Sequence, residues 1–313
     1  MNELLKLEPV FKQMIWGGNR MKDYFGYDIP GDDTGEAWVV SAHPQGDCRI
    51  REGRFAGKTL SWLWKEHREL FGGLEGDQFP LLVKIIDARD DLSIQVHPDD
   101  AYAGEKEGGA LGKTECWYIL DCKDQADIIV GHRAKSREKM REMIGEKRWN
   151  EFLNVRPIHP GDFFQINPGT VHAIKNGTLL IEIQQNSAIT YRLYDYDRLS
   201  GGKPRELHLD KAMDVIRCPY EDAAGDRTTR HEEGYDHTRL ISCDYYTVDK
   251  YDIQSSLSLN QDRPFLIVSV ISGEGTLDKT AVKKGDHMIL PCGYGTALLE
   301  GEMSIVVSGV PES

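Results

Sequence analysis

The sequence predicts a mainly β protein, built as a sandwich or barrel with helical inserts. Short segments rich in β-branched and aromatic residues recur along the chain, and Gly, Pro, Asp or Asn bounds them as turns bound strands. Helical patterns are too few to place a helix after each strand, which argues against a regular βαβ sheet. With 313 residues, the chain has room for one large domain or two ordinary ones.

Predicted strands occupy both halves of the chain. Four apolar runs in the C-terminal part, "RLISCDYYTVDKYDI", "PFLIVSVISG", "HMILPCG" and "MSIVVSGV", read as strands. Those of the N-terminal part are 36–44, 80–88, 92–98, 116–122, 162–168, 178–187 and 189–197.

Three segments predict helices. Segment 58–73 places apolar residues on one stripe and ends at glycine, and 135–153 begins at Ser136, a good N-cap residue. Segment 209–217 predicts a shorter helix. The polar, charged segment 221–237 is expected to be a linker.

Composition limits the classes of partner. Acidic residues exceed basic ones, 51 to 38, so the net charge of −13 disfavours nucleic acid and anionic membranes. An anionic ligand would therefore need Lys and Arg gathered locally. The six cysteines form no C-x-x-C pair, no apolar run reaches about 20 residues, and the N-terminus lacks a signal-peptide pattern. We expect a cytoplasmic protein with reduced thiols and no membrane or nucleic-acid partner.

A weak internal repeat indicates two copies of one β unit. "PGDFFQINPGTVHAI" (160–174) aligns with "KGDHMILPCGYGTAL" (284–298): each has a Gly-Asp turn, a strand, and a second glycine eight residues after the first. His172 in the first copy falls opposite Thr296 in the second. The repeat predicts two related barrels, of which only the first carries this histidine.

The stretch "SIQVHPDD" (93–100) places two polar side chains on one face of a strand. Gln95 and His97 are two residues apart and so point the same way. Facing a barrel interior unpaired, they would be costly to bury, and a metal ion would satisfy both. Glu115 and His172 complete a mixed nitrogen and oxygen set suited to zinc. The alternative is that these residues lie on a wet strand face without a metal.

The order Q-x-H, Glu, then P-G-x-x-H resembles the cupin pattern, in which two motifs supply the metal ligands. Here "GDFFQINPGTVHAIKN" follows the second motif, while Gln95 replaces the first histidine of the first motif. The chain is similar over nearly its whole length to type I mannose-6-phosphate isomerases (phosphomannose isomerases) of the short bacterial kind. The segments that carry this resemblance are 11–18, 34–44, 92–100, 112–120, 168–174 and 181–198.

The resemblance implies a fold and a reaction. The fold is two cupin-type jelly-roll barrels: a catalytic metal-binding domain at 1–230 with a helical insert near 132–154, and a degenerate domain at 231–313 that lacks metal ligands. The reaction interconverts mannose 6-phosphate and fructose 6-phosphate by proton transfer through an enediolate. The chain is expected to act as a monomer or homodimer.

The resemblance also assigns site residues. One Zn²⁺ per chain is bound by Gln95, His97, Glu115 and His172, and Lys113 and Arg192 belong to the catalytic site. Arg192 would stabilise developing negative charge, and Lys113 could serve as base only if its surroundings favour the neutral amine. The sequence does not identify the catalytic base. It also does not distinguish among the candidate phosphate ligands, which are Lys113, Lys175, Arg198 and Lys203.

The sequence departs from the family pattern at one position, and two alternative functions remain open. Ala188 stands where many related sequences carry an acid, so this protein must do without that acid or use a neighbour such as Asp195 or Glu182. A non-catalytic cupin that binds or senses sugars would keep the barrel without the chemistry, although it would need neither the metal ligands nor Arg192. A cupin dioxygenase is disfavoured because Gln95 replaces a histidine suited to iron.

Overall fold

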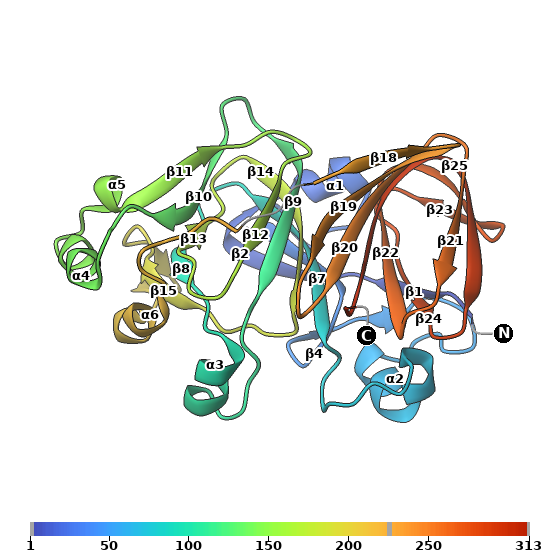
Figure 1. Cartoon of the computed structure of the whole chain (residues 1–313), viewed down its shortest axis with the longest axis horizontal. Coiled ribbons are helices and arrows are strands. Elements are labelled where there is room, and N and C mark those ends of the chain that lie inside the picture. Colours follow the sequence, from blue (N-terminus) through green and yellow to red (C-terminus); the bar gives the residue numbers. More distant parts are fainter. Residues whose placement is uncertain (1–2, 224–226, 312–313) are drawn as a thin grey trace.

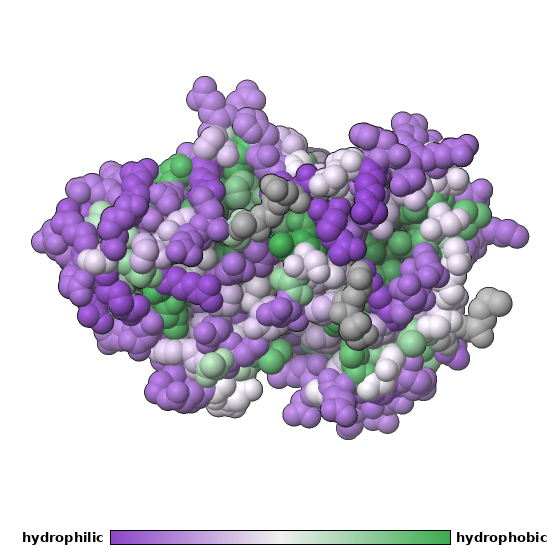
Figure 2. All heavy atoms as spheres, in the orientation of Figure 1, coloured by the Kyte–Doolittle hydropathy of each residue, from purple (hydrophilic) through white to green (hydrophobic). Residues whose placement is uncertain are grey.

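The computed structural model describes residues 3–223 and 227–311, and the chain is mainly β as predicted. Three large antiparallel sheets form two lobes, seen side by side in Figure 1. The lobe with α3 to α6 holds a six-stranded and a five-stranded sheet, and the other lobe holds a ten-stranded sheet. The surface in Figure 2 is largely hydrophilic, with scattered apolar spots between the charged side chains.

The six-stranded sheet has the order β12-β9-β14-β7-β2-β3, with β7 also pairing β3. Every residue of its central strands β7 and β14 is buried, so the sheet is covered on both sides. The strands are β2 (Val10–Gly18), β3 (Thr34–Val40), β7 (Leu81–Ala88), β9 (Glu115–Cys122), β12 (Phe163–Ile166) and β14 (Thr178–Gln185).

The five-stranded sheet has the order β11-β10-β13-β8-β15 and faces the six-stranded sheet across the first barrel. Its members are β8 (Ile94–Val96), β10 (Asp127–His132), β11 (Leu153–Pro157), β13 (His172–Ala173) and β15 (Tyr191–Tyr194). Two short ribbons complete this half: β4 (Ala42–His43) with β5 (Gly46–Asp47), and β16 (Leu199–Ser200) with β17 (Lys203–Pro204).

The ten-stranded sheet has the main order β18-β19-β20-β25-β22-β24-β1-β6, and β21 and β23 pair with β25 and β22. It recruits two strands from the N-terminal segment, because β1 pairs with β24 and β6 pairs with β1. The strands are β1 (Leu5–Glu8), β6 (Arg49–Ile50), β18 (Thr229–Glu232), β19 (Tyr235–Ser242), β20 (Thr247–Ile253), β21 (Ser256–Gln261), β22 (Phe265–Leu277), β23 (Thr280–Lys283), β24 (His287–Pro291) and β25 (Gly295–Gly309).

Helices lie where the sequence predicts them, but they are shorter. Segment 58–73 forms α2 (Leu60–Glu66) and a 3₁₀ turn, η1 (Arg68–Phe71), closed by Gly72 in the left-handed region. Segment 135–153 forms α4 (Arg137–Gly145) and α5 (Trp149–Phe152). The Oγ of Ser136 caps α4 by accepting from the backbone N–H of Lys139 at 3.2 Å, as predicted. The helix predicted at 209–217 is α6 (Leu209–Val215), whereas α1 (Arg20–Phe25) and α3 (Asp100–Lys106) were not predicted from the sequence.

The six-stranded sheet separates two cores. Along β14, Leu180 and Glu182 face the first barrel, whereas Ile181 and Ile183 face the ten-stranded sheet, as strand alternation requires. Ile181 and Ile183 share one apolar cluster with Phe265 of the second lobe. The two lobes are therefore joined by a continuous apolar core.

The internal repeat has the same local structure in both copies. Gly161 and Gly285 both have φ of 93°. The carboxylate that follows each glycine accepts a backbone N–H three residues upstream: Asp162 from His159 at 2.7 Å, and Asp286 from Lys283 at 3.0 Å. Strands β12 and β24 start directly after these turns. The predicted turn-and-strand unit is thus present in each lobe.

The expected linker at 221–237 is only partly a linker. Residues 224–226 lie outside the described residues, 229–232 form β18, the edge strand of the ten-stranded sheet, and 235–237 begin β19. The prediction of no strand there was wrong because all four side chains of β18 are exposed, so an apolar pattern is absent. Within the described residues, no helix is long and apolar enough to cross a bilayer, and all six cysteines are free thiols.

Candidate metal centre and substrate pocket

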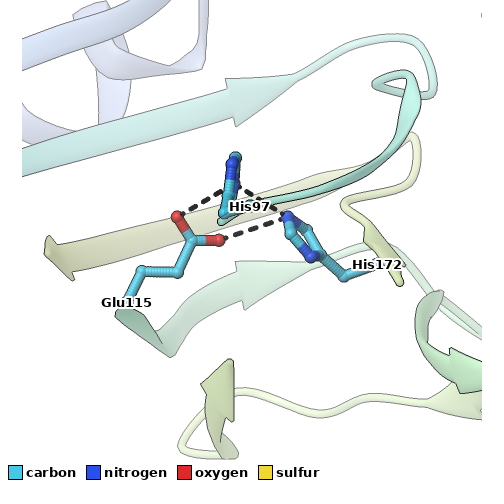
Figure 3. Close-up of side chains that lie close together, drawn as sticks. All are labelled: His97, Glu115 and His172. Atoms are coloured by element: carbon cyan, nitrogen blue, oxygen red, sulfur yellow. Dashed lines mark hydrogen bonds and ion pairs between the residues drawn. The ribbon is translucent and has the colours of Figure 1, made fainter. Parts of the chain in front are cut away.

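The four predicted metal ligands come together between the two sheets of the first barrel. Gln95 lies on β8 and His97 directly follows it, while His172 is on the neighbouring strand β13, where it pairs in register with Gln95. Glu115 begins β9 in the opposite sheet. His97, Glu115 and His172 are buried, and Figure 3 shows their ligand atoms converging on one point.

The distances within this cluster suit a shared cation. The Nε2 atoms of His97 and His172 lie 3.1 Å apart. They lie 3.5 and 3.4 Å from the two carboxylate oxygens of Glu115. These three side chains are the only His, Cys, Asp or Glu group in the described part of the chain with the geometry of a metal site.

Backbone carbonyls orient both imidazoles. The Nδ1–H of His97 donates to the carbonyl of Ile189 at 2.7 Å, and that of His172 donates to Thr170 at 2.9 Å. Each Nε2 is then unprotonated and directed inward, which is the tautomer that binds a metal. Burial, and then the charge of Lys113, lowers the pKa of His97 well below its usual range, and burial lowers the pKa of His172 to about 4.

Glu115 carries the strongest signal for a cation. Its side chain is buried, its Oε2 lies 2.5 Å from Nζ of Lys113, and its Oε1 accepts no hydrogen bond within the described residues. Burial, and then the charge of Glu182, raises the pKa of Glu115 to about 7. A bound divalent cation would satisfy both oxygens and favour the ionised form, so the donor set fits a metal.

Gln95 stands beside both imidazoles. Its Nε2 lies 3.3 Å from Nε2 of His172 and 3.5 Å from Nε2 of His97, and its Oε1 accepts from Ser93 at 3.1 Å. Oxygen and nitrogen of an amide exchange places by a half-turn of the terminal bond. Gln95 is thus placed to offer an oxygen to a cation held by the other three residues.

Lysine and glutamate side chains form a charged network beside the cluster. The Nζ of Lys113 lies 2.5 Å from Glu115, 3.3 Å from Nε2 of His97 and 3.8 Å from Glu182. Lys84 lies 3.3 Å from Glu182, which also accepts from Nε1 of Trp117 at 3.0 Å. Burial opposes ionisation of Glu182, but Lys113 and Lys84 outweigh it and lower its pKa to about 2.

A pocket of about 230 Å³ opens onto this network. Arg192 of β15 lines it beside Gln95, its partner in register on β8, and Ala188 lines it as well. Of the four lysines and arginines considered for the phosphate, Lys113 lines the pocket. Its other lining residues include Trp16, Glu36, Trp38, Lys84, Trp117, His172, Glu182 and Arg205.

The other candidate phosphate ligands lie outside the pocket. Lys175 pairs with Asp127, Lys203 is exposed on the β16–β17 ribbon, and Arg198 bonds the carbonyl of Asp91 and the carboxylate of Asp195. None of the three lines the pocket. The spacing of basic residues could not separate them from Lys113, because it depends on which strands the fold brings together.

Sequence reasoning missed two basic residues of the pocket, Lys84 and Arg205. Lys84 sits in the apolar run "PLLVKIIDA", and a single charge in an otherwise buried strand is a usable signal for a paired, functional group. It lies in register between Trp38 of β3 and Glu182 of β14. Arg205 follows a short ribbon and has no such signal.

Comparison with protein families matches both halves of the chain. Residues 4–120 match the model for the catalytic domain of type I phosphomannose isomerase. Residues 236–310 match the model for the cupin domain of mannose-6-phosphate isomerase.

Whole-chain relatives are similar throughout. The mannose-6-phosphate isomerase ManA of Bacillus subtilis is 51% identical over 314 residues, which cover 98% of each chain. A mannose-6-phosphate isomerase of Streptococcus mutans is 44% identical, again covering 98% of each chain.

Solved structures match in the same way. The crystal structure of the Bacillus subtilis mannose 6-phosphate isomerase has a TM-score of 0.97 and 48% identity, covering 99% of this chain and 100% of that one. A variant of the Salmonella typhimurium phosphomannose isomerase shares the fold at a TM-score of 0.78 with 15% identity, covering 99% of this chain and 100% of that one.

Proposed function

This chain belongs to the type I phosphomannose isomerase family, and on that premise we propose that it interconverts mannose 6-phosphate and fructose 6-phosphate. The observation that carries the proposal is the buried Glu115 between two inward-facing imidazoles, beside a pocket that His172 and two arginines line. An isomerase of this class must move a proton between C2 and C1 of the sugar, and it must stabilise the enediolate that forms between them.

The metal is proposed to be one Zn²⁺ per chain, with Gln95, His97, Glu115 and His172 as ligands. Two imidazoles with oxygen donors suit zinc, and a site with fewer protein ligands than coordination positions leaves room for substrate. Zinc bound there would act as a Lewis acid toward the sugar oxygens next to the migrating proton. The carbonyls of Ile189 and Thr170 keep the imidazoles in the orientation that this binding needs.

Lys113 is the proposed acid–base group. Its Nζ lies between the cluster and Glu182, on the wall that the reacting carbons of a bound sugar would face. The carboxylate of Glu182, 3.8 Å away, stays ionised and holds the amine in place, and it is proposed to take the role for which Ala188 has no group. Arg192 then stabilises the negative charge of the enediolate, because a guanidinium stays protonated.

The phosphate is proposed to bind at Arg205, which lines the pocket together with Arg192. Burial and then the positive charge of Arg205 lower the pKa of Arg192, which means that the two guanidinium groups repel each other. The Nε of Arg192 is also buried without a hydrogen-bond partner among the described residues. A dianionic group between two such cations relieves this repulsion and uses their free N–H groups.

The remaining assignments concern the whole chain. Residues 1–230 form the proposed catalytic domain and 231–313 a degenerate barrel, although β1 and β6 of the first segment complete the sheet of the second. The chain is proposed to work in the cytoplasm, because phosphorylated sugars are charged and do not cross bilayers readily. It is proposed to act as a monomer or homodimer.

A coupled assay of mannose 6-phosphate conversion tests the function directly. Activity is measured on the protein as purified, after chelation, and after zinc is restored. We expect activity to vanish with the chelator and to return with zinc, and His97→Ala to abolish both zinc retention and turnover. Stoichiometric zinc without isomerisation would reject the reaction, and turnover that survives complete removal of metal would reject the metal site.

A further inference from the structure

We propose that Asp195 is a positioning residue, which fixes the guanidinium of Arg205 at the pocket so that it can grip the phosphate of the substrate. This inference rests on the proposed function and extends it to a residue that does not itself line the pocket. Asp195 follows β15 and Arg205 follows the β16–β17 ribbon, so the turn of this ribbon brings them together.

The contact between the two side chains is two-pronged. The Nε of Arg205 donates to Oδ2 of Asp195 at 2.7 Å, and Nη2 donates to Oδ1 at 2.5 Å. Only 3% of the Asp195 side chain and 17% of the Arg205 side chain are exposed. Parallel hydrogen bonds of this kind fix the plane of the guanidinium as well as its distance.

The pairing leaves the opposite edge of Arg205 available. Its Nη1 donates no hydrogen bond to the described part of the chain, and Arg205 lines the pocket that Arg192 also lines. A guanidinium presents five donors in a rigid fork, so holding one edge sets the direction of the other. Asp195 therefore orients the edge that faces an anion in the pocket.

Asp195 also joins the two ends of the ribbon, because it binds an arginine at each end. Its Oδ1 accepts from Nη2 of Arg198 at 2.6 Å, and Arg198 and Arg205 flank the ribbon Leu199–Pro204 on its two sides. Arg198 bonds the carbonyl of Asp91 and does not line the pocket. Asp195 thus binds two arginines that differ in their position. Arg198 holds the ribbon and does not line the pocket, whereas Arg205 lines the pocket.

This separation supplies a matched control for the experiment. The Michaelis constant for mannose 6-phosphate and kcat are measured for wild type, Asp195→Asn, Arg205→Ala, the double variant and Arg198→Ala. We expect Asp195→Asn to raise KM on the order of ten- to a hundredfold while kcat changes much less, because the reacting carbons lie at the other end of the sugar. Arg198→Ala is expected to leave KM within about threefold of wild type.

The double variant tests whether Asp195 acts through Arg205. If it does, adding Asp195→Asn to Arg205→Ala raises KM no further, since the group being positioned is already gone. Independent effects that multiply in the double variant, or an equal rise of KM in Arg198→Ala, would overturn the proposal in favour of a purely structural role.

Arg205→Lys covers the case in which Asp195→Asn fails to fold. Lysine keeps the charge but cannot make the two-pronged contact, so its KM should approach that of Arg205→Ala. A wild-type KM in Arg205→Lys would overturn the proposal.

Binding measurements distinguish this inference from the proposed reaction. If wild type does not isomerise mannose 6-phosphate, the affinities of the same variants for fructose 6-phosphate and for inorganic phosphate are measured by calorimetry. The proposal then predicts weaker binding of both in Asp195→Asn and not in Arg198→Ala. Equal affinities in wild type and Asp195→Asn would reject it whatever the reaction is.

Discussion

At the scale of single residues, buried groups of opposite charge contact one another beside the pocket, and Lys113 makes the most contacts that matter for the proposed reaction. Its amine contacts Glu115, His97 and Glu182 without being one of the proposed ligands. We expect Lys113→Met to lower kcat by about 10²- to 10⁴-fold, the usual contribution of a positioned acid–base group, and to leave zinc content unchanged. Lys65→Met, at a lysine that is 81% exposed, is the control. Zinc loss in parallel with activity would instead make Lys113 a support of the metal site.

Lys84 is a second residue whose charge is fully paired inside the protein. It lies between Glu182 and Glu36, 3.3 and 3.9 Å from their carboxylates. Removing one partner of a buried ion pair leaves the other uncompensated, so Lys84→Met should lower the free energy of unfolding by about 3–5 kcal/mol. Adding Glu182→Gln should recover part of that loss. Urea unfolding of the two single variants and the double variant measures this, and simple additivity would contradict it.

At the scale of elements, the two copies of the repeat offer a paired test. Both Gly161 and Gly285 have φ of 93°, where a side chain is strained, but a Cβ on Gly161 meets only the hydroxyl of Tyr118 at 3.8 Å. A Cβ on Gly285 would lie 3.0 Å from the ring of Tyr27. We expect Gly161→Ala to cost about 1–2 kcal/mol from strain, and Gly285→Ala to cost at least about 1 kcal/mol more from overpacking.

Gly145 is the control for this pair. It ends α4 with open space around its Cα, so Gly145→Ala should be neutral or slightly stabilising. All three free energies are measured by denaturant unfolding. Equal losses at Gly161 and Gly285 would show that contact with Tyr27 contributes nothing.

Elements with a periodic apolar pattern could be predicted from the sequence, and those shaped by tertiary pairing could not. Strands β7 and β14 and the cap of α4 at Ser136 follow from local pattern. The exposed strand β18 does not, because it exists only through its pairing with β19. The cluster of Gln95, His97, Glu115 and His172 could be assembled from strand alternation and motif order. Arg205 could not, since its approach to Asp195 depends on the whole ribbon.

At the scale of the whole molecule, the second barrel shows how one repeated unit keeps its fold without the charged cluster of the first barrel. Glu115 pairs with Ile166 across β9 and β12, and the repeat aligns Ile166 with Leu290, whose partner on β22 is Leu266. Leu266 is buried in the apolar core of the second lobe. A leucine thus stands where the first barrel has the carboxylate of Glu115, and apolar packing replaces the charge.

A buried histidine connects strand β24 of the second lobe to the N-terminal segment of the chain. His287 of β24 lies 2.9 Å from the hydroxyl of Tyr27, which belongs to the N-terminal segment, and its Nδ1 lies 2.9 Å from Ser269. Burial lowers its pKa to about 3, although Asp286 acts in the opposite direction; Arg51 also lowers it. Between pH 6.5 and 3 the unfolded chain therefore binds a proton that the folded chain does not. Stability falls as pH falls across this window, by up to about 1.4 kcal/mol per pH unit.

His287→Gln removes this titration, so we expect the variant to lose less stability than wild type between pH 7 and pH 5, even if it is less stable at pH 7. Urea midpoints at several pH values measure the difference. The contributions of His97 and His172 to the pH dependence cancel, because both proteins contain them. His159→Gln, at a side chain that is 80% exposed, is the control. An unchanged pH slope in His287→Gln would mean that the acid sensitivity of the fold arises elsewhere, and that the junction between β24 and the N-terminal segment tolerates a charged imidazole.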